Sequence, residues 1–134
     1  MISRIDQEFG FSQKAINLRA YRQELLSSNI ANADTPHFKA RDIDFKEALE
    51  GALGNSRGGP LSLATTSPRH IQAPDTNRFG AEVKYRTEEQ SNVDGNTVHM
   101  DAERAAFAEN AIQMEAMLTF INGKFKTLNS ALQP

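Results

Sequence analysis

Apolar residues recur along the C-terminal part of the chain with the spacing of a coiled-coil seam. Steps of four and three residues alternate between eight positions, which we call the seam: Phe107, Ala111, Met114, Leu118, Ile121, Phe125, Leu128 and Leu132. This spacing predicts a long helix that buries one face against another helix. Met117 and Phe120 lie beside the seam and widen it, which indicates more than one neighbour. The seam has no reactive group, so it favours a packing or assembly protein; a core helix of an ordinary small bundle is the alternative.

A second long helix is expected from about residue 5 to residue 32. Its apolar residues form two neighbouring stripes, the first with Ile5, Phe9, Ile16, Leu26 and Ile30 and the second with Phe11, Ala15, Leu18 and Leu25. Ser12, Arg19 and Gln23 interrupt the first stripe, so this helix has a weaker apolar face than the C-terminal one. Pro36 stops it, because proline lacks a backbone N–H and biases Thr35 away from helical geometry.

Residues 37–96 are punctuated by turn formers and predict only short elements. A short helix is expected from Phe45 to Leu53, followed by a loop with four glycines and a proline in residues 51–60. Residues 61–66 fit a short strand, and the alternation in residues 81–88 fits a half-exposed strand. A turn at residues 92–96 leads to the C-terminal helix, which Thr97 or Asp101 could cap.

These elements predict a mainly α fold: an antiparallel coiled coil of long N- and C-terminal helices with a small irregular β-containing middle segment. The expected division is residues 1–36 as the N-terminal helix of the coiled-coil domain, 37–96 as the middle segment with short strands and a flexible loop, and 97–134 as the C-terminal helix. The broken middle segment can cover little apolar surface. We therefore expect neighbouring copies to supply the remaining burial.

The charge balance and the lack of cysteine exclude several classes of protein. There are 15 basic and 17 acidic residues, giving a net charge of −2 without a basic block, which argues against nucleic acid as the main partner. Without cysteine, no disulfide or cysteine nucleophile can form. No apolar run approaches the roughly 18 residues that span a bilayer. The first residues lack the apolar core of a cleaved signal peptide, so sequence physics alone indicates the cytoplasm.

The candidate catalytic and metal-binding residues do not form a convincing site. His37, His70 and His99 have no second ligand at a metal-binding spacing, and His70 and His99 fit surface or helix-cap positions. Asp42 and Asp44 could share one face of a strand, but their basic neighbours favour a salt-bridged surface strand or turn over a catalytic pair. We therefore expect no enzyme activity, no metal and no cofactor.

Four stretches resemble a known family. The segment Ser28-Asn29-Ile30-Ala31-Asn32-Ala33-Asp34-Thr35-Pro36 resembles the N-terminal signature of the flagellar basal-body rod, hook and hook-associated family. The flanking Asn17-Leu18-Arg19-Ala20, Ala40-Arg41-Asp42-Ile43-Asp44-Phe45 and the later Asp94-Gly95-Asn96-Thr97-Val98-His99-Met100-Asp101 resemble its proximal rod members. One departure is that His37 and Phe38 follow Pro36, where the family commonly has Gly and Tyr. A positive φ at His37 would therefore cost energy.

The resemblance implies a structural protein of the proximal rod that assembles through helical packing, transmits torque and encloses the export channel. The implied partners are itself and other rod proteins, an adaptor and a membrane-ring protein at the rod base, and the type III export apparatus. Export would bring it to the periplasmic rod without a cleaved signal peptide, and neither nucleic acid nor direct lipid binding is expected. The residues that match the family motif are Asn29, Ile30, Ala31, Asn32, Thr35 and Pro36. The alternative is a small helical adaptor or export-chaperone-like binding module.

Overall fold

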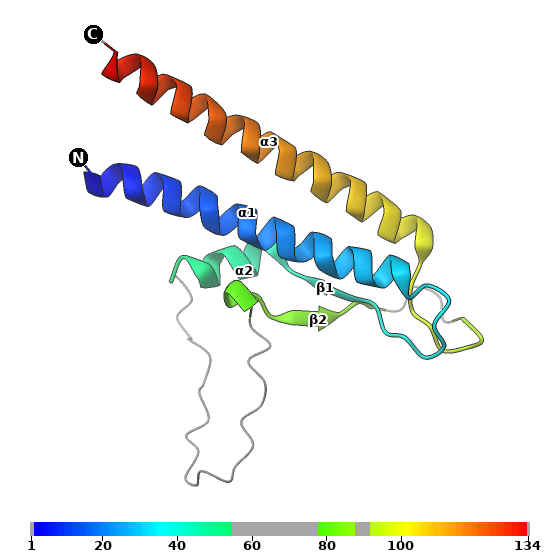
Figure 1. Ribbon diagram of the computed structural model, residues 1–134. Coiled ribbons are helices and arrows are strands. Elements are labelled where there is room, and N and C mark those ends of the chain that lie inside the picture. Colours follow the sequence, from blue (N-terminus) through cyan, green and yellow to red (C-terminus); the bar gives the residue numbers. More distant parts are fainter. Residues whose placement is uncertain (1, 55–77, 88–91, 134) are drawn as a thin grey trace, which may run out of the picture.

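Two long helices dominate the computed structural model, which describes residues 2–54, 78–87 and 92–133. Helix α1 runs over Ile2–Ala31 and helix α3 over Met100–Leu132. Both termini lie at the same end of the molecule, so the two helices run in opposite directions (Figure 1). The expectation of a mainly α fold with long terminal helices is confirmed.

In its described part, the middle segment contributes four short elements: strand β1 (Arg41–Ile43), helix α2 (Phe45–Ala52), the 3-10 turn η1 (Arg78–Gly80) and strand β2 (Val83–Tyr85). The strands pair antiparallel, with Asp42 opposite Lys84. The helix expected from Phe45 is confirmed, and the strand expected in residues 81–88 forms over a shorter stretch. The strand expected at residues 61–66, most of the glycine-rich loop and His70 lie outside the described residues.

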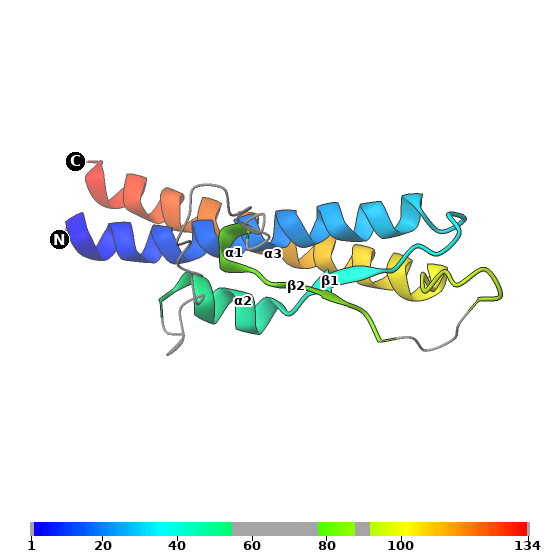
Figure 2. The same ribbon diagram turned by 90° about the horizontal axis from the view of Figure 1, so that it is seen from below.

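Helix α1 is the middle layer of the molecule. Figure 1 shows α3 on one side of it and α2 with the small sheet on the other, and in Figure 2, seen from below, α1 and α3 cross each other. The apolar core lies on this second side, where Leu18 and Leu25 of α1 meet Ile43, Ala48 and Ala81. Helix α3 packs chiefly against α1 and takes no part in this core. The fold is therefore anchored beneath α1 and leaves most of α3 at the surface.

Helix α3 begins with a histidine cap. His99 has extended backbone angles, and its Nδ1 accepts a hydrogen bond of 3.3 Å from the backbone N–H of Ala102. The expectation of Thr97 or Asp101 as the cap is wrong. The Thr97 hydroxyl oxygen instead accepts from the backbone N–H of Ala40, and Asp101 already lies in the first helical turn. His99 caps α3 because the chain enters the helix two residues later than Thr97 would require.

The side chains that α3 buries are polar rather than apolar. Within the described helix only Glu103 and Asn110 are buried. Five seam residues are half-buried, and the other three are exposed: Leu118 at 46%, Phe125 at 51% and Leu132 at 81%. The seam is thus covered only in part: even Phe125, whose ring stacks on Phe9 of α1, stays half exposed. Phe120, beside the seam, is also uncovered, at 67%.

Candidate assembly surface

The end of α1 is closed by a buried asparagine from the far side of the chain. Asn96 is 0% exposed, and its Nδ2 donates to the backbone oxygens of Asn32, Ala33 and Thr35 at 3.0, 2.8 and 2.8 Å. These carbonyls belong to the turn that follows α1, and two of them also accept from turn amides: the Asn32 oxygen from the Thr35 N–H and the Thr35 oxygen from the Phe38 N–H. Asn96 thus supplies a second donor to this turn from a distant segment. Its Oδ1 accepts from the backbone N–H of Val98 at 2.8 Å. Sequence reasoning read Asn96 only as part of a turn.

The motif turn itself is held by its own side chains. Asn32 donates from Nδ2 to the backbone oxygen of Ser28 at 2.8 Å, and its Oδ1 accepts from the Thr35 hydroxyl at 3.1 Å. Both bonds fix the chain as it leaves α1. Pro36 follows at the exposed tip of the turn. These motif residues therefore shape the helix end locally and leave the longer-range contacts to Asn29 and Asn96.

His37, which follows Pro36, adopts the left-handed backbone conformation, the conformation that would be costly for a residue other than glycine. Its φ is 60°, and its backbone N–H donates to the backbone oxygen of Asp94 at 3.0 Å. The imidazole lies against Gly95, where an added Cβ would come within 2.9 Å of Nδ1. The turn around His37 is therefore built by two distant segments, residues 32–38 and 94–97. Their contacts hold His37 in a conformation that costs energy for a non-glycine residue.

Asn29 joins α1 to both β1 and α3. It is 1% exposed; its Nδ2 donates to the backbone oxygen of Arg41 at 2.8 Å and its Oδ1 accepts from the Arg41 N–H at 3.0 Å. The side-chain amide thus pairs with the strand edge as another backbone would. The same Nδ2 lies 3.2 Å from Glu103 Oε2 of α3. One motif side chain therefore connects three elements.

Four charged side chains extend this contact. Glu103, 1% exposed, accepts from Arg86 at 2.9 Å, and Arg86 also donates to Asp42 at 2.7 Å. Arg22 holds both oxygens of Asp42, at 2.9 and 3.0 Å. Two carboxylates are thus paired with two guanidinium groups. Charged side chains can be buried only when they are paired and hydrogen-bonded in this way. The expected salt bridge of Asp42 is present, but its partners come from α1 and from beyond β2.

A buried asparagine also fixes the rotation of α3 on α1. Asn110 is 0% exposed, and its Nδ2 donates to the Arg19 backbone oxygen at 2.9 Å and to Gln23 Oε1 at 2.6 Å. The Arg19 guanidinium stacks on the Phe45 ring at 3.6 Å. Arg19 and Gln23 are the residues that interrupt the apolar stripe of α1. A single buried asparagine between helices sets register at some cost in stability.

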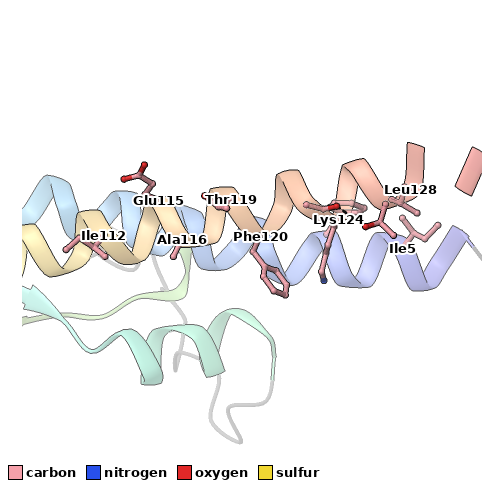
Figure 3. A pocket seen from close by; sticks show the side chains of 11 residues that line it. Ile5, Ile112, Glu115, Ala116, Thr119, Phe120, Lys124 and Leu128 are labelled. Carbon is pink, nitrogen blue, oxygen red and sulfur yellow. Dashed lines mark hydrogen bonds between the residues drawn. The ribbon is translucent and has the colours of Figure 1, made fainter. Parts of the chain in front are cut away.

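C-terminal to Asn110, an open apolar groove of about 910 Å³ lies between the two long helices. Figure 3 shows Phe120 pointing away from the helix pair, while Ile5 and Leu128 lie close together at the terminal end. The groove is lined by Ile5, Phe9, Ile112, Glu115, Ala116, Thr119, Phe120, Gly123, Lys124, Thr127 and Leu128. Phe9 stacks on Phe125 with 4.7 Å between ring centroids. This ring pair is an aromatic contact between the terminal halves of the helices.

The described residues were compared with the requirements of a metal site and of a membrane-spanning helix. No group of three or more potential metal-ligating side chains occurs in residues 2–54, 78–87 and 92–133. Within the same ranges, none of the helices combines the length and apolar character needed to cross a bilayer. The candidate functional surface is thus the uncovered seam with its groove, positioned by the polar contacts at the other end of α1 and α3.

We expect replacement of Asn96 by alanine to lower the free energy of unfolding by about 2–3 kcal/mol, since a fully buried side chain and its hydrogen bonds to three carbonyls and to the Val98 N–H would be lost. Asn96→Asp should cost at least as much, because a carboxylate would face the same carbonyl oxygens. Urea unfolding followed by circular dichroism measures both. Asn122→Ala, an exposed asparagine of α3, is the control and should change stability by less than about 0.5 kcal/mol. Equal stability of the Asn96 and Asn122 variants would contradict the proposed role of Asn96.

We also expect the charged cluster to weaken in acid. Burial opposes ionisation of Asp42, but hydrogen bonds from Arg22 and Arg86 outweigh it and hold the pKa of this carboxyl below its ordinary value of 3.8. A depressed folded-state pKa contributes stability that is present above the unfolded pKa and lost as the pH falls through the folded one. The stability difference between the natural chain and Asp42→Asn should therefore shrink below about pH 4. Urea midpoints measured from neutral pH downwards test this, and a constant difference would contradict it.

The comparisons with known proteins agree on one family. The description "Flagella basal body rod protein" belongs to the family model that matches residues 10–39, which include the motif turn. The chain is 46% identical over 135 residues to "Flagellar basal body rod protein FlgB" of Proteus mirabilis strain HI4320, covering 99% of this chain and 98% of that one. It is similar to proteins of the same name from Yersinia enterocolitica, at 46%, and Escherichia coli K12, at 43%, with the same coverage.

Proposed function

Because the chain belongs to the flagellar basal-body rod protein family, and is thus a structural component of the basal body, we propose that it stands in the proximal rod and transmits torque there. The relatives are named as rod proteins and not as enzymes. The alternative, a small adaptor or export-chaperone-like module, is not favoured, since similarity to rod proteins covers 99% of the chain.

The observation that carries this proposal is the mismatch between the seam and its burial. A helix with eight regularly spaced apolar positions normally buries them, yet no apolar side chain of the described α3 is fully buried. Contiguous exposed apolar surface on a polar protein marks an interaction site. Neighbouring rod subunits would cover this surface and complete the burial that α1 leaves unfinished.

In the assembled state we propose that α1 and α3 pack as an antiparallel coiled coil. Residues 1–36 and 97–134 would then form one domain, and residues 37–96 would form a middle segment attached to it. The motif residues Asn29, Ile30, Ala31, Asn32, Thr35 and Pro36 would fix where α1 ends and how α3 returns along it. The seam residues would supply the contacts between subunits that carry torque and enclose the export channel.

The partners that this function requires lie at both ends of the proximal rod. We propose contacts with further copies and other rod proteins, and with an adaptor and a membrane-ring protein at the base. Delivery by the flagellar type III export apparatus, without a cleaved signal peptide, would take the chain from the cytoplasm to the periplasmic rod. Nothing in the described surface calls for nucleic acid or direct lipid binding.

Fractionation of cells tests this function directly. Basal bodies would be purified with detergent from cells that carry a tagged copy of the chain in place of the natural one. We expect the tagged chain to remain with the basal bodies after the membrane has been removed. Recovery of the tagged chain only as a compact monomer or dimer in the soluble fraction would overturn the proposal and favour the adaptor class.

We further expect the terminal halves of the helices to be loosely held in the purified monomer. No described residue before Ser12 or after Asn110 is buried, so opening those turns exposes little additional apolar surface. Amides in residues 2–11 and 111–132 should exchange with deuterium much faster than amides in residues 18–31 and 100–110. Slow exchange along the whole of both helices would contradict this expectation.

A further inference from the structure

Asn122 and Gly123 form the only Asn-Gly pair in the sequence, and they lie in the C-terminal half of α3. Both residues are exposed. Gly123 lines the groove, and a Cβ added there would meet no packing partner within 4 Å, so neighbouring side chains do not hold the backbone at this point. Figure 3 shows this turn of α3 between the labelled Phe120 and Lys124. The pair is therefore open to water and unsupported by packing.

An asparagine that is followed by glycine can lose its side-chain amide without an enzyme. The backbone nitrogen of Gly123 attacks Cγ of Asn122 and gives up its proton, and the Cγ–Nδ2 bond breaks with release of ammonia. The resulting five-membered succinimide takes up one water molecule and opens to aspartate or to isoaspartate. Glycine favours this reaction, because the absence of a Cβ leaves its backbone nitrogen accessible and its backbone free to turn.

An intact helix opposes the attack, since the N–H of Gly123 is directed at the carbonyl of Thr119, four residues earlier. The turn must open first, and three features weaken it. Glycine is a poor helix former. The Thr127 hydroxyl donates to the backbone oxygen of Gly123 at 3.0 Å, a local bond that competes with helical pairing. In addition, no residue of the described α3 after Asn110 is buried, so opening exposes little additional apolar surface.

Two comparable sites are held closed by the fold. Asp94 also precedes a glycine, but its Oδ1 accepts from the backbone N–H of Asn96 at 3.1 Å. The backbone N–H of Gly95, which would be the attacking group there, donates to the backbone oxygen of Asn92 at 2.9 Å. Asn110 lies in the same helix as the Asn-Gly pair, but it is 0% exposed and its Nδ2 donates to two acceptors on α1. The Asn-Gly pair of α3 has neither safeguard.

We propose that Asn122 is a site of spontaneous deamidation in the unassembled chain and that assembly protects it. The protection rests on the proposed function, because subunits packed along α3 would hold its helical turns closed. The product places a carboxylate beside Ile121 of the seam, and isoaspartate also inserts a methylene into the backbone and so interrupts the helix. Chains that age before assembly thus lose part of the surface through which they join the rod.

Incubation of the purified chain in mildly alkaline water labelled with heavy oxygen, followed by trypsin digestion and tandem mass spectrometry, tests the reaction. Cleavage after Arg104 and Lys124 gives one peptide that contains both Asn110 and Asn122. We expect conversion at Asn122 to be at least about tenfold faster than at Asn110, because opening costs less where no side chain is buried. The product should carry one heavy oxygen and include isoaspartate. Equal rates at the two sites, or aspartate without isoaspartate, would overturn the proposal.

A matched pair of glycine variants identifies the attacking group. Gly123→Ala keeps Asn122 but adds a Cβ beside the attacking nitrogen, and it should slow the conversion at least about tenfold. Gly10→Ala is the control, since Gly10 is a helical glycine of α1 where an added Cβ would also meet nothing within 4 Å. It should leave the rate at Asn122 unchanged. The same rate in Gly123→Ala as in the natural chain would contradict attack by the Gly123 nitrogen.

The protection is measured separately, in cells in which protein synthesis has been stopped. The deamidated fraction at Asn122 would be compared between chains recovered with basal bodies and unassembled chains from the same cells. We expect a smaller fraction in basal bodies, and equal fractions would refute the protection. Absence of the chain from basal bodies would instead sink the proposed function and the protection with it, whereas the reaction at Asn122 is decided by the purified chain alone.

Discussion

Replacement of Glu103 by alanine is expected to lower the free energy of unfolding by about 3 kcal/mol, out of the roughly 5–15 kcal/mol of a typical domain. The carboxylate is 1% exposed and accepts from both Asn29 and Arg86. Its removal takes one of two acceptors from the Asn29 amide, which keeps the Arg41 carbonyl, and one of two from Arg86. The expected cost lies at the low end for a broken buried pair, because the Arg86 side chain is 28% exposed and keeps Asp42.

Two matched variants make this prediction specific. Glu109→Ala removes an exposed carboxylate of the same helix and should cost less than about 0.5 kcal/mol. Glu103→Gln keeps an acceptor of the same size without the charge, so its cost should fall between the other two. Urea unfolding of the purified chains measures all three. If Glu103→Ala proved as stable as Glu109→Ala, the buried cluster would not be what joins α3 to the rest of the fold.

The second large effect is expected from Ile121→Glu, which should abolish motility while the chain is still synthesised and folded. Ile121 is a half-buried seam residue in the part of α3 where no described side chain is fully buried. A carboxylate there can reach water in the monomer, so stability should fall by no more than about 1–2 kcal/mol. In an assembled rod the same charge would be desolvated between subunits, which is far more costly.

Swimming in soft agar by cells that carry only the variant measures this effect. Ala108→Glu is the matched control, because it adds the same carboxylate at an exposed position of α3 outside the seam. The control should swim normally. Normal swimming by Ile121→Glu cells would count decisively against assembly through the seam, whereas poor swimming by both variants would show a general intolerance of charge on this helix.

The local sequence pattern was sufficient to predict the two long helices and the position where α1 ends. The seven-residue periodicity of α3 and the proline at position 36 act over a few neighbouring residues, so the long helices could be predicted from the sequence. The family resemblance likewise rests on continuous stretches. The expected cap of α3 failed because His99 and Thr97 are both capable acceptors, and only the contact with Ala40 shows which one is already used.

The polar contacts depended on the tertiary structure. Asn96 reaches carbonyls more than 60 positions away, and Asn110 meets Arg19 at a separation of 91. Such side chains look like turn or surface residues in a sequence, because their environment is set by segments that only folding brings together. The one available signal was that Arg19 and Gln23 break the α1 stripe, since interruptions of an apolar face need polar partners across the interface.

The sequence by itself determined that this chain has a regularly spaced apolar helix face and belongs with rod proteins, because both are written in contiguous residues. Only the tertiary structure decided which part of that face remains available. The hydrogen bonds of Asn110 to α1 fix the rotation of α3, and in the folded chain Leu118, Phe125 and Leu132 of the seam stay exposed. The rotation of a helix about its axis depends on how it packs against its partner helix. The periodicity of one helix sequence therefore cannot specify it.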